Sequence, residues 1–272
     1  MPSVLTICGS LRTQSFHNRL LTFAESELDR LGVATQRLKN LRDLPRFDED
    51  LDDDERRPEL VTDLLSKVVS VDAVLLSTPT YNGSLPSAVK DVIDWCSRPL
   101  GAGPIRGRKI GLIAASPGPH GGAPGLEYLQ RVLRALGATV IKPIVALPEV
   151  HNAFGVDTLS AAVSRHILDV SRSVALAAKG AEVVDDPVLQ RFEIRTGGPT
   201  PALLGFVDYR SMGDRIELPH TVTQPEFEGQ GVASALIREV LDRLRADEKQ
   251  VIPSCWFVAK FIENNAEYQS ML

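Results

Sequence analysis

The sequence predicts an α/β protein, in which a doubly wound sheet of five parallel strands is followed by a small α+β domain. The chain has 272 residues, which is about 1.8 times the roughly 150 residues expected for one domain. Residues 1–180 alternate apolar runs with amphipathic segments, a pattern typical of strands joined by helices. After Gly180, short segments alternate apolar and polar residues instead, which indicates antiparallel strands.

The strands predicted in the first part are short apolar runs, at residues 4–8, 33–38, 72–78, 109–115 and 139–144. Helical spacing predicts helices at residues 18–31, 59–69, 87–95, 126–136 and 157–179. Because the two element types alternate, the sheet is predicted to be parallel and covered by helices on both faces. The acidic segment 45–57 shows no periodicity and is predicted to be a solvated loop.

The second part has a different order of elements. Strands are predicted at residues 192–195, 203–209, 215–222 and 250–253, and helices at 233–244 and 255–264. Residues 208–214, DYRSMGD, are predicted to form a turn. We expect the domain boundary near 181–190, where charged residues and a proline occur together.

Composition and charge exclude several classes of protein. The net charge is −5, which argues against nucleic acid or an anionic membrane as the main partner. Residues 1–180 carry 21 basic and 20 acidic side chains, whereas residues 181–272 carry 9 and 15. The three cysteines are widely spaced, so we expect neither a disulfide framework nor a metal site. With no secretory signal or run of about 20 apolar residues, a cytoplasmic protein without membrane insertion is expected.

Three loops follow strands whose carboxyl ends should meet at one edge of the parallel sheet, where ligands of such sheets bind. The first, residues 9–15, combines small residues, hydroxyls and Arg12 before a helix, and this chemistry suits a phosphate group. The second, residues 79–86, places Tyr81 among turn residues and could flank a flat ring. The third, residues 116–122, is rich in glycine, which allows close approach of backbone to a planar ligand.

Each loop also has a simpler interpretation. The first could be a serine-rich helix cap, and the other two could be tight turns without a ligand. The occurrence of all three at neighbouring strand ends favours a binding site.

Four segments then show a resemblance to a known family. GSLRTQSFHN, LPRFDEDL, PTYNGSLPSAVKDVIDW and SPGPHGG resemble, in order and spacing, the NADPH-dependent FMN reductases, a flavodoxin-like group that includes quinone, chromate and azo-dye reductases. The similarity covers roughly residues 3–178 and assigns residues 1–182 to a flavodoxin-like domain. It implies non-covalent FMN, with the phosphate held by Ser10, Arg12, Ser15 and Asn18. The ring would be bordered by Pro79, Tyr81, Asn82, Gly83 and Ser84 and closed on its pyrimidine side by Ser116, Gly118, Gly121 and Gly122.

The same resemblance implies an oxidoreductase. Hydride would pass from NADPH or NADH through FMN to a small-molecule acceptor: a quinone, an azo compound, a metal oxyanion or a free flavin. No protein acid or base is required, so these residues are predicted as cofactor ligands. A homodimer or homotetramer is implied, although Thr80 stands where a glutamate that tends to serve subunit contacts is common. Cys8, Cys96 and His120 are expected to have no chemical role.

The second part contains a glycine turn before a predicted helix, where amide groups could hold a pyrophosphate. A flexible connection is the simpler interpretation. HTVTQPEFEGQGVASALIREVL and VIPSCWFVAKFIENNAEY resemble a small, truncated branch of the GNAT acetyltransferases over about residues 190–271, which assigns residues 188–272 to a GNAT-like domain. The resemblance implies acetyl-CoA at Gly229, Gly231, Val232 and Ala233.

Two features qualify this second site. Glu226 and Glu228 place negative charge beside the expected pyrophosphate and should weaken its binding. Cys255 as a nucleophile and Tyr268 as an acid are candidates for acetyl transfer, although packing roles are the simpler interpretation. Two other functions therefore remain open: an acetyltransferase with a flavin-binding redox sensor, or a reductase whose second domain is a degenerate interaction module.

Overall fold

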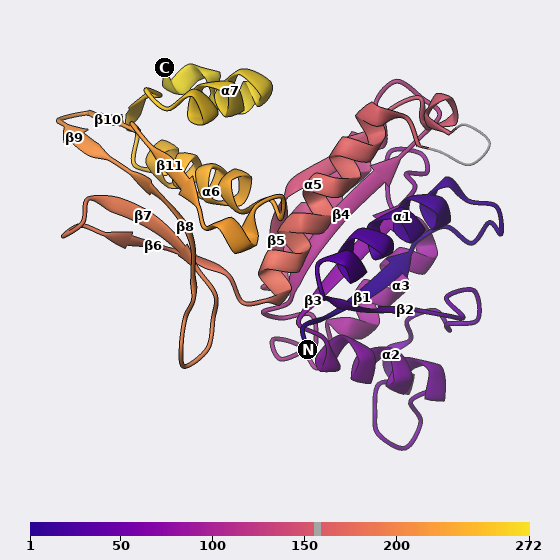
Figure 1. The fold of residues 1–272 in the computed structure, drawn as a ribbon. Helices are drawn as coiled ribbons and strands as arrows, with labels where there is room; N and C mark the ends of the chain where they lie inside the picture. The colour runs from indigo at the N-terminus through magenta and orange to yellow at the C-terminus, as the bar shows by residue number, and fades with distance from the viewer. Residues whose placement is uncertain (155–158) are drawn as a thin grey trace. The chain divides into compact units, whose positions relative to one another are not determined.

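A computed structural model describes residues 1–154 and 159–272 and divides the chain into two compact units, Met1–Ala178 and Lys179–Leu272 (Figure 1). The sequence predicts the boundary within the charged segment 181–190, whereas the two units divide between residues 178 and 179, just before that segment. Residues of that segment form a strand of the second unit, β6 (Glu182–Asp186), which pairs with β7 (Arg191–Arg195). In the described part of the chain, no helix combines the length and apolarity needed to cross a membrane.

The first unit contains the predicted five-stranded parallel sheet in the order β2-β1-β3-β4-β5, the order of flavodoxin-like folds. The strands are β1 (Ser3–Cys8), β2 (Ala34–Arg37), β3 (Ala73–Thr78), β4 (Lys109–Ala115) and β5 (Thr139–Leu147). All six residues of β3 are buried, because helices cover both faces of the sheet. The sequence prediction of this architecture is confirmed.

The helices of the first unit are α1 (Phe16–Arg30), α2 (Glu59–Ser70), α3 (Ser87–Cys96), α4 (Ala123–Ala135) and α5 (Ala161–Ala178). Alternate residues of β3 belong to two separate apolar cores. Val74 and Leu76 pack with α2, α3 and α4, whereas Ala73 and Leu75 pack with α1 and α5. The start predicted for the last helix, at Asp157, lies outside the described residues.

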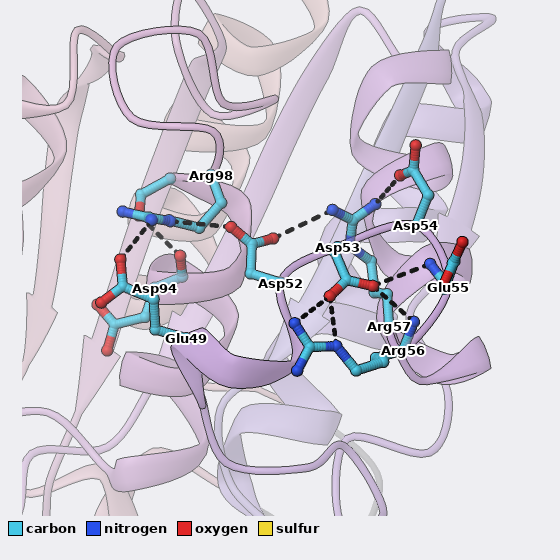
Figure 2. A network of polar contacts seen from close by, with 10 residues as sticks. Glu49, Asp52, Asp53, Asp54, Glu55, Arg56, Arg57, Asp94 and Arg98 are labelled. Carbon is cyan, nitrogen blue, oxygen red and sulfur yellow. Dashed lines mark hydrogen bonds and ion pairs between the residues drawn. The ribbon is translucent and has the colours of Figure 1, made fainter.

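The acidic segment 45–57 is largely solvent-exposed and mostly irregular, as the sequence predicts, but ion pairs that the sequence does not reveal organise it. Residues Glu49–Leu51 form a 3₁₀ turn, and most of the surrounding carboxylates are paired with arginines (Figure 2). Asp52 bonds Arg57 at 3.1 Å and Arg98 at 3.0 Å, and its side chain is only 9% exposed. Since Arg98 follows α3, this network fastens the segment to that helix. A periodicity argument cannot detect such pairing, because the partners lie up to 49 residues apart.

The second unit has two small sheets in its described residues, with strand orders β11-β8-β7-β6 and β12-β10-β9. The remaining strands are β8 (Leu203–Asp208), β9 (Arg210–Met212), β10 (Arg215–Glu217), β11 (Thr221–Thr223) and β12 (Gln250–Ile252). The helices are α6 (Val232–Ala246) and α7 (Trp256–Asn264), close to their predicted positions.

Three sequence predictions for this unit are wrong. Residues 215–222 form two strands in different sheets, because Pro219 lacks the N–H group needed to continue a ladder. Residues 210–212, predicted as part of a turn, form the edge strand β9. The edge strand β6 is absent from the prediction, since its charged sequence EVVDD resembles a linker.

Candidate functional site

The three chemically distinctive loops of the first unit lie together, as the sequence predicts. β3 pairs in parallel with β1 on one side and with β4 on the other, so the loops that follow these strands share one edge of the sheet (Figure 1). All of the residues predicted to contact FMN belong to these loops or to the first turn of α1. The loops reach this edge from positions in the sequence that are about 35 to 110 residues apart.

The first loop is shaped by its own hydroxyl and amide side chains. The Ser10 hydroxyl accepts a hydrogen bond from the backbone N–H of Arg12 at 3.4 Å, and the Ser15 hydroxyl caps α1 by accepting from His17 N at 3.1 Å. Asn18 donates from Nδ2 to the carbonyl oxygen of Thr13 at 3.4 Å. Ser10 and Ser15 are buried, while the Arg12 side chain is exposed and has no polar partner among the described residues. This guanidinium is therefore available to an anion.

The second loop presents an aromatic ring on a tight turn. Tyr81 and Ser84 exchange two backbone hydrogen bonds of 2.9 Å, and the two residues between them have positive φ, 52° at Asn82 and 75° at Gly83. Asn-Gly is the pair that favours this left-handed conformation. The turn leaves Tyr81 half exposed.

The third loop packs closely against the end of β5. The backbone N–H of Ser116 donates to the carbonyl oxygen of Leu147 at 3.1 Å. Gly121 has φ of 60°, and a β-carbon there would lie 2.6 Å from backbone atoms of Leu147 and Pro148. Gly122 has φ of 87° and caps α4. Only glycine fits such a conformation and contact without strain. His120 lies exposed on this loop.

A hollow of about 460 Å³ opens beside the first loop, and its lining carries positive charge. The residues that line it are Gly9, Leu11, Arg12, Thr13, Gln14, Arg42, Tyr81, Pro86, Ser87 and Ala88. The set contains two arginines and no carboxylate. The first turn of α3 also contributes, because Pro86 provides no side-chain cap and the N–H groups of a helix start have no intrahelical partner. The hollow therefore suits a phosphate-bearing ligand.

Arg42 is a functional candidate that sequence reasoning missed. Its Nη2 donates to the carbonyl oxygen of Leu11 at 2.5 Å, which leaves its other N–H groups for a ligand in the hollow. The residue follows β2 and lies 30 positions from Arg12 in the sequence. No motif marks it, so only the fold places the two guanidinium groups at one hollow.

His17 is buried beneath the loops. Its Nδ1 lies 2.9 Å from the Ser77 hydroxyl at the end of β3, and the side chain is 4% exposed. Burial lowers the pKa of His17 from 6.5 to about 4, a shift partly opposed by a contact with the backbone of Ala115. The ring is thus neutral near pH 7, and it connects α1 to β3 without adding a charge beneath the site. Cys8 is half-buried nearby, where burial raises the pKa of its thiol; burial likewise raises the pKa of Cys96 to about 12.

The glycine turn of the second unit lies directly before α6. Gly229 and Gly231 have φ of 71° and 81°, and Gly231 caps a helix of 15 residues without a side-chain bond. Val232 is buried and Ala233 is half-buried in the first turn. Glu226 and Glu228 are exposed beside the turn, as expected. This helix start offers N–H groups to an anion, in a setting that contains two carboxylates.

Cys255 and Tyr268 have different surroundings. Cys255 caps α7; burial alone would raise the pKa of its thiol, but the Thr221 hydroxyl and the N–H groups of Val258 and Phe257 outweigh burial and hold it below its usual value. Tyr268 is fully buried and donates to Asp242 Oδ1 at 3.1 Å. Burial and the Asp242 carboxylate raise the pKa of Tyr268. Both residues are buried; the environment fits a packing role for Tyr268 and gives Cys255 a thiol of lowered pKa.

Comparison with family models assigns both units. Residues 2–152 match the model described as NADPH-dependent FMN reductase, which is more than half of the chain. Residues 191–271 match the model described as GCN5-related N-acetyl-transferase.

Individual proteins agree with the first match. A quinone reductase of Pseudomonas putida is 38% identical over 149 residues, which is 55% of this chain and 76% of that protein. A quinone reductase of Escherichia coli is 33% identical over 138 residues, covering 51% of this chain and 72% of that protein. Among solved structures, the flavoenzyme NAD(P)H:acceptor oxidoreductase FerB of Paracoccus denitrificans has a TM-score of 0.56 and 27% identity. That alignment covers 64% of this chain and 97% of FerB.

The buried histidine makes the stability of the first unit depend on pH. Between pH 6.5 and about 4, the unfolded chain binds a proton at His17 that the folded chain does not, so stability falls as the pH falls. The full contribution is about 3 kcal/mol for a shift of this size. We expect His17→Gln to flatten the dependence of unfolding free energy on pH over this range.

Urea unfolding at pH 7 and pH 4.5 would measure the effect. Trp95 is buried in the first unit, so its fluorescence can report the unfolding of that unit once the other tryptophan is removed by Trp256→Phe. The protein with His17 and the His17→Gln variant are therefore compared in this Trp256→Phe background. If the unfolding free energy changed equally between pH 7 and pH 4.5 with and without His17, the ring would be taking up its proton in the folded state as it does in the unfolded chain.

Proposed function

The chain belongs to the NADPH-dependent FMN reductase family, and on this premise we propose that its first unit binds FMN and passes reducing equivalents from NADPH to a small quinone-type acceptor. The observation that carries the proposal is the meeting of three loops at the carboxyl ends of β1, β3 and β4, where the first two loops line a hollow with two arginines and no carboxylate. This arrangement suits a ligand in which an anionic group is attached to a flat ring system.

The first loop would hold the phosphate. Arg12 has no other polar partner among the described residues, and Arg42 stands across the same hollow, so two guanidinium groups can offset the charge of a phosphate. The hydroxyls of Ser10 and Ser15 fold the loop, and they together with Asn18 would complete the phosphate site through short polar contacts. The residues present therefore fit the phosphate end of FMN.

The second and third loops would hold the ring. Tyr81 would border one side, with the backbone of Pro79, Asn82, Gly83 and Ser84 close to it. Gly118, Gly121, Gly122 and Ser116 would approach the pyrimidine edge, because glycine leaves the backbone uncovered. When bound, FMN supplies the hydride transfer chemistry, while the protein positions the ring and limits access of water. We also include a homodimer or homotetramer in the proposal, as the family resemblance implies.

For the second unit we propose binding of acetyl-CoA, supported by the match of residues 191–271 to the GCN5-related N-acetyl-transferase model and by the glycine turn before α6. The turn would hold the pyrophosphate at the start of the helix. Cys255 then is a candidate nucleophile, because its surroundings favour the thiolate. Acetyl transfer remains the second candidate function of the chain.

The flavin proposal predicts a coloured protein. The purified full chain should show flavin absorbance, or gain it when reconstituted with FMN, and NADPH should bleach the bands under anaerobic conditions. Riboflavin, which lacks the phosphate, is the matched control ligand and should bind more weakly. A colourless protein that FMN cannot reconstitute would contradict the proposal.

The phosphate assignment predicts the effect of removing one guanidinium. Arg12→Ala should weaken FMN binding by about 1.5–3 kcal/mol, the range for a hydrogen bond to a charged group. Titration of apoprotein with FMN measures this change by flavin fluorescence. Arg165→Ala removes an exposed arginine of α5 that does not line the hollow and is the control. An FMN dissociation constant unchanged in Arg12→Ala would place the phosphate elsewhere.

The acetyl-CoA proposal predicts measurable binding that is limited by local negative charge. Calorimetry of the full chain should detect acetyl-CoA, and Glu228→Gln should tighten the complex because it removes a carboxylate beside the turn. Glu182→Gln makes the same change at an exposed position of β6 and should leave affinity unchanged. Absence of binding in all three proteins would favour the interaction-module interpretation of this unit.

A further inference from the structure

Thr80 joins the second and third loops of the candidate flavin site. It follows Pro79 at the end of β3, and its hydroxyl donates to the carbonyl oxygen of Gly122 at 3.0 Å. Gly122 caps α4 and lies 42 residues further along the chain. The bond is partly buried, so water does not freely replace it. One side chain therefore spans the two loops that would border the ring.

The glycines opposite Thr80 leave room for this side chain. A β-carbon at Gly125 would lie 2.5 Å from Oγ1 and 2.8 Å from Cγ2 of Thr80, closer than real contacts allow. A β-carbon at Gly122 would lie 2.8 Å from the same Oγ1. Gly125 has no positive φ, so its place in the first turn of α4 is explained by this contact and not by backbone conformation. Thr80 and Gly125 fit each other as a pair.

The third loop is also anchored on its far side. Gly121 packs on the backbone of Leu147 and Pro148, and Ser116 bonds to Leu147. The third loop is thus held to the end of β5 on one side and to the second loop, through Thr80, on the other. The distance between the second and third loops then depends on the Thr80 side chain.

We propose that Thr80 is a positioning residue for the flavin, whose contact with Gly122 and Gly125 sets the separation of the two loops that hold the ring. The proposal rests on the proposed function, because it concerns the same FMN site. Thr80 would touch no reacting atom, because it acts through the loop backbone. Its hydroxyl maintains the bond between loops, and its methyl group fills the space above Gly125.

Two substitutions separate these contributions. Thr80→Val keeps the shape and removes the hydroxyl, and it should raise the dissociation constant of FMN about 5- to 10-fold, as expected for loss of one neutral hydrogen bond. Thr80→Ser keeps the hydroxyl and should stay near the wild-type value. The visible circular dichroism of the bound flavin should change in the first variant and be restored in the second. Thr62→Val makes the same chemical change at an exposed position of α2 and is the control.

A double-mutant cycle tests the pair directly. Gly125→Ala alone should weaken FMN binding, because the new methyl group displaces the Thr80 side chain. In a Thr80→Ala background, the same change should have much less effect, since Oγ1 and Cγ2 of residue 80 are gone and only its β-carbon, at 3.2 Å, remains. Non-additive changes in FMN affinity would support the coupling of these two residues.

The outcomes are distinct. Wild-type FMN affinity and dichroism in Thr80→Val would overturn the proposal, even if the apoprotein unfolded at a lower temperature, because the contact would then be structural only. Additive effects of Thr80→Ala and Gly125→Ala on FMN affinity would also overturn it. Failure of the wild-type chain to bind FMN at all would instead be failure of the proposed function. Thermal unfolding of each apoprotein shows that the variants are folded.

Discussion

The parallel pairing of β3 with both β1 and β4 is the constraint on which the candidate site depends. Because β3 is buried on both faces, it contributes no side chain to the surface, and function can only be placed at its carboxyl end. The first loop leaves β1 so close to β3 that a β-carbon at Gly9 would lie 2.8 Å from the Thr78 hydroxyl and 2.5 Å from Val89. A glycine at this position allows the first loop to cross the strand ends and reach α3.

The distribution of charge follows from the same arrangement. Polar groups buried beneath the loops, such as His17 and Ser77, are paired with each other and uncharged near pH 7. The cations Arg12 and Arg42 stand at the exposed rim, where their hydration is not lost on folding. An incoming phosphate can therefore meet positive charge and helix-start N–H groups without any ion having been buried beforehand. Neither arginine belongs to the core, and Arg42 uses one N–H group for Leu11 while its others stay available to a ligand.

Much of the first unit can be predicted from the sequence because its signals are local. Apolar runs define the strands, and Asn82-Gly83 defines the turn that presents Tyr81. Contacts across the fold cannot be predicted in this way. Arg42 reaches the hollow from beyond β2, and the fit between Thr80 and Gly125 joins residues of separate loops. In the second unit, short strands with charged residues, such as β6, give no periodic signal, and one proline divides an alternating segment into strands of two sheets.

Both units contain a glycine-containing loop directly before a helix, but the charged side chains around the two loops have opposite signs. In the first unit the first turn of α3 and two guanidinium groups line the hollow, and no carboxylate does. In the second unit Glu226 and Glu228 flank the turn, and the Lys179 ammonium donates to Gln230 Oε1 in the turn at 3.4 Å. Burial also lowers the pKa of that lysine, so its surroundings disfavour the charged form. Helix-start amides contribute similarly in both places, so the charged side chains decide the difference. An anionic cofactor should therefore be held more tightly by the first unit, and the affinity of the second should depend more on contacts away from its phosphates.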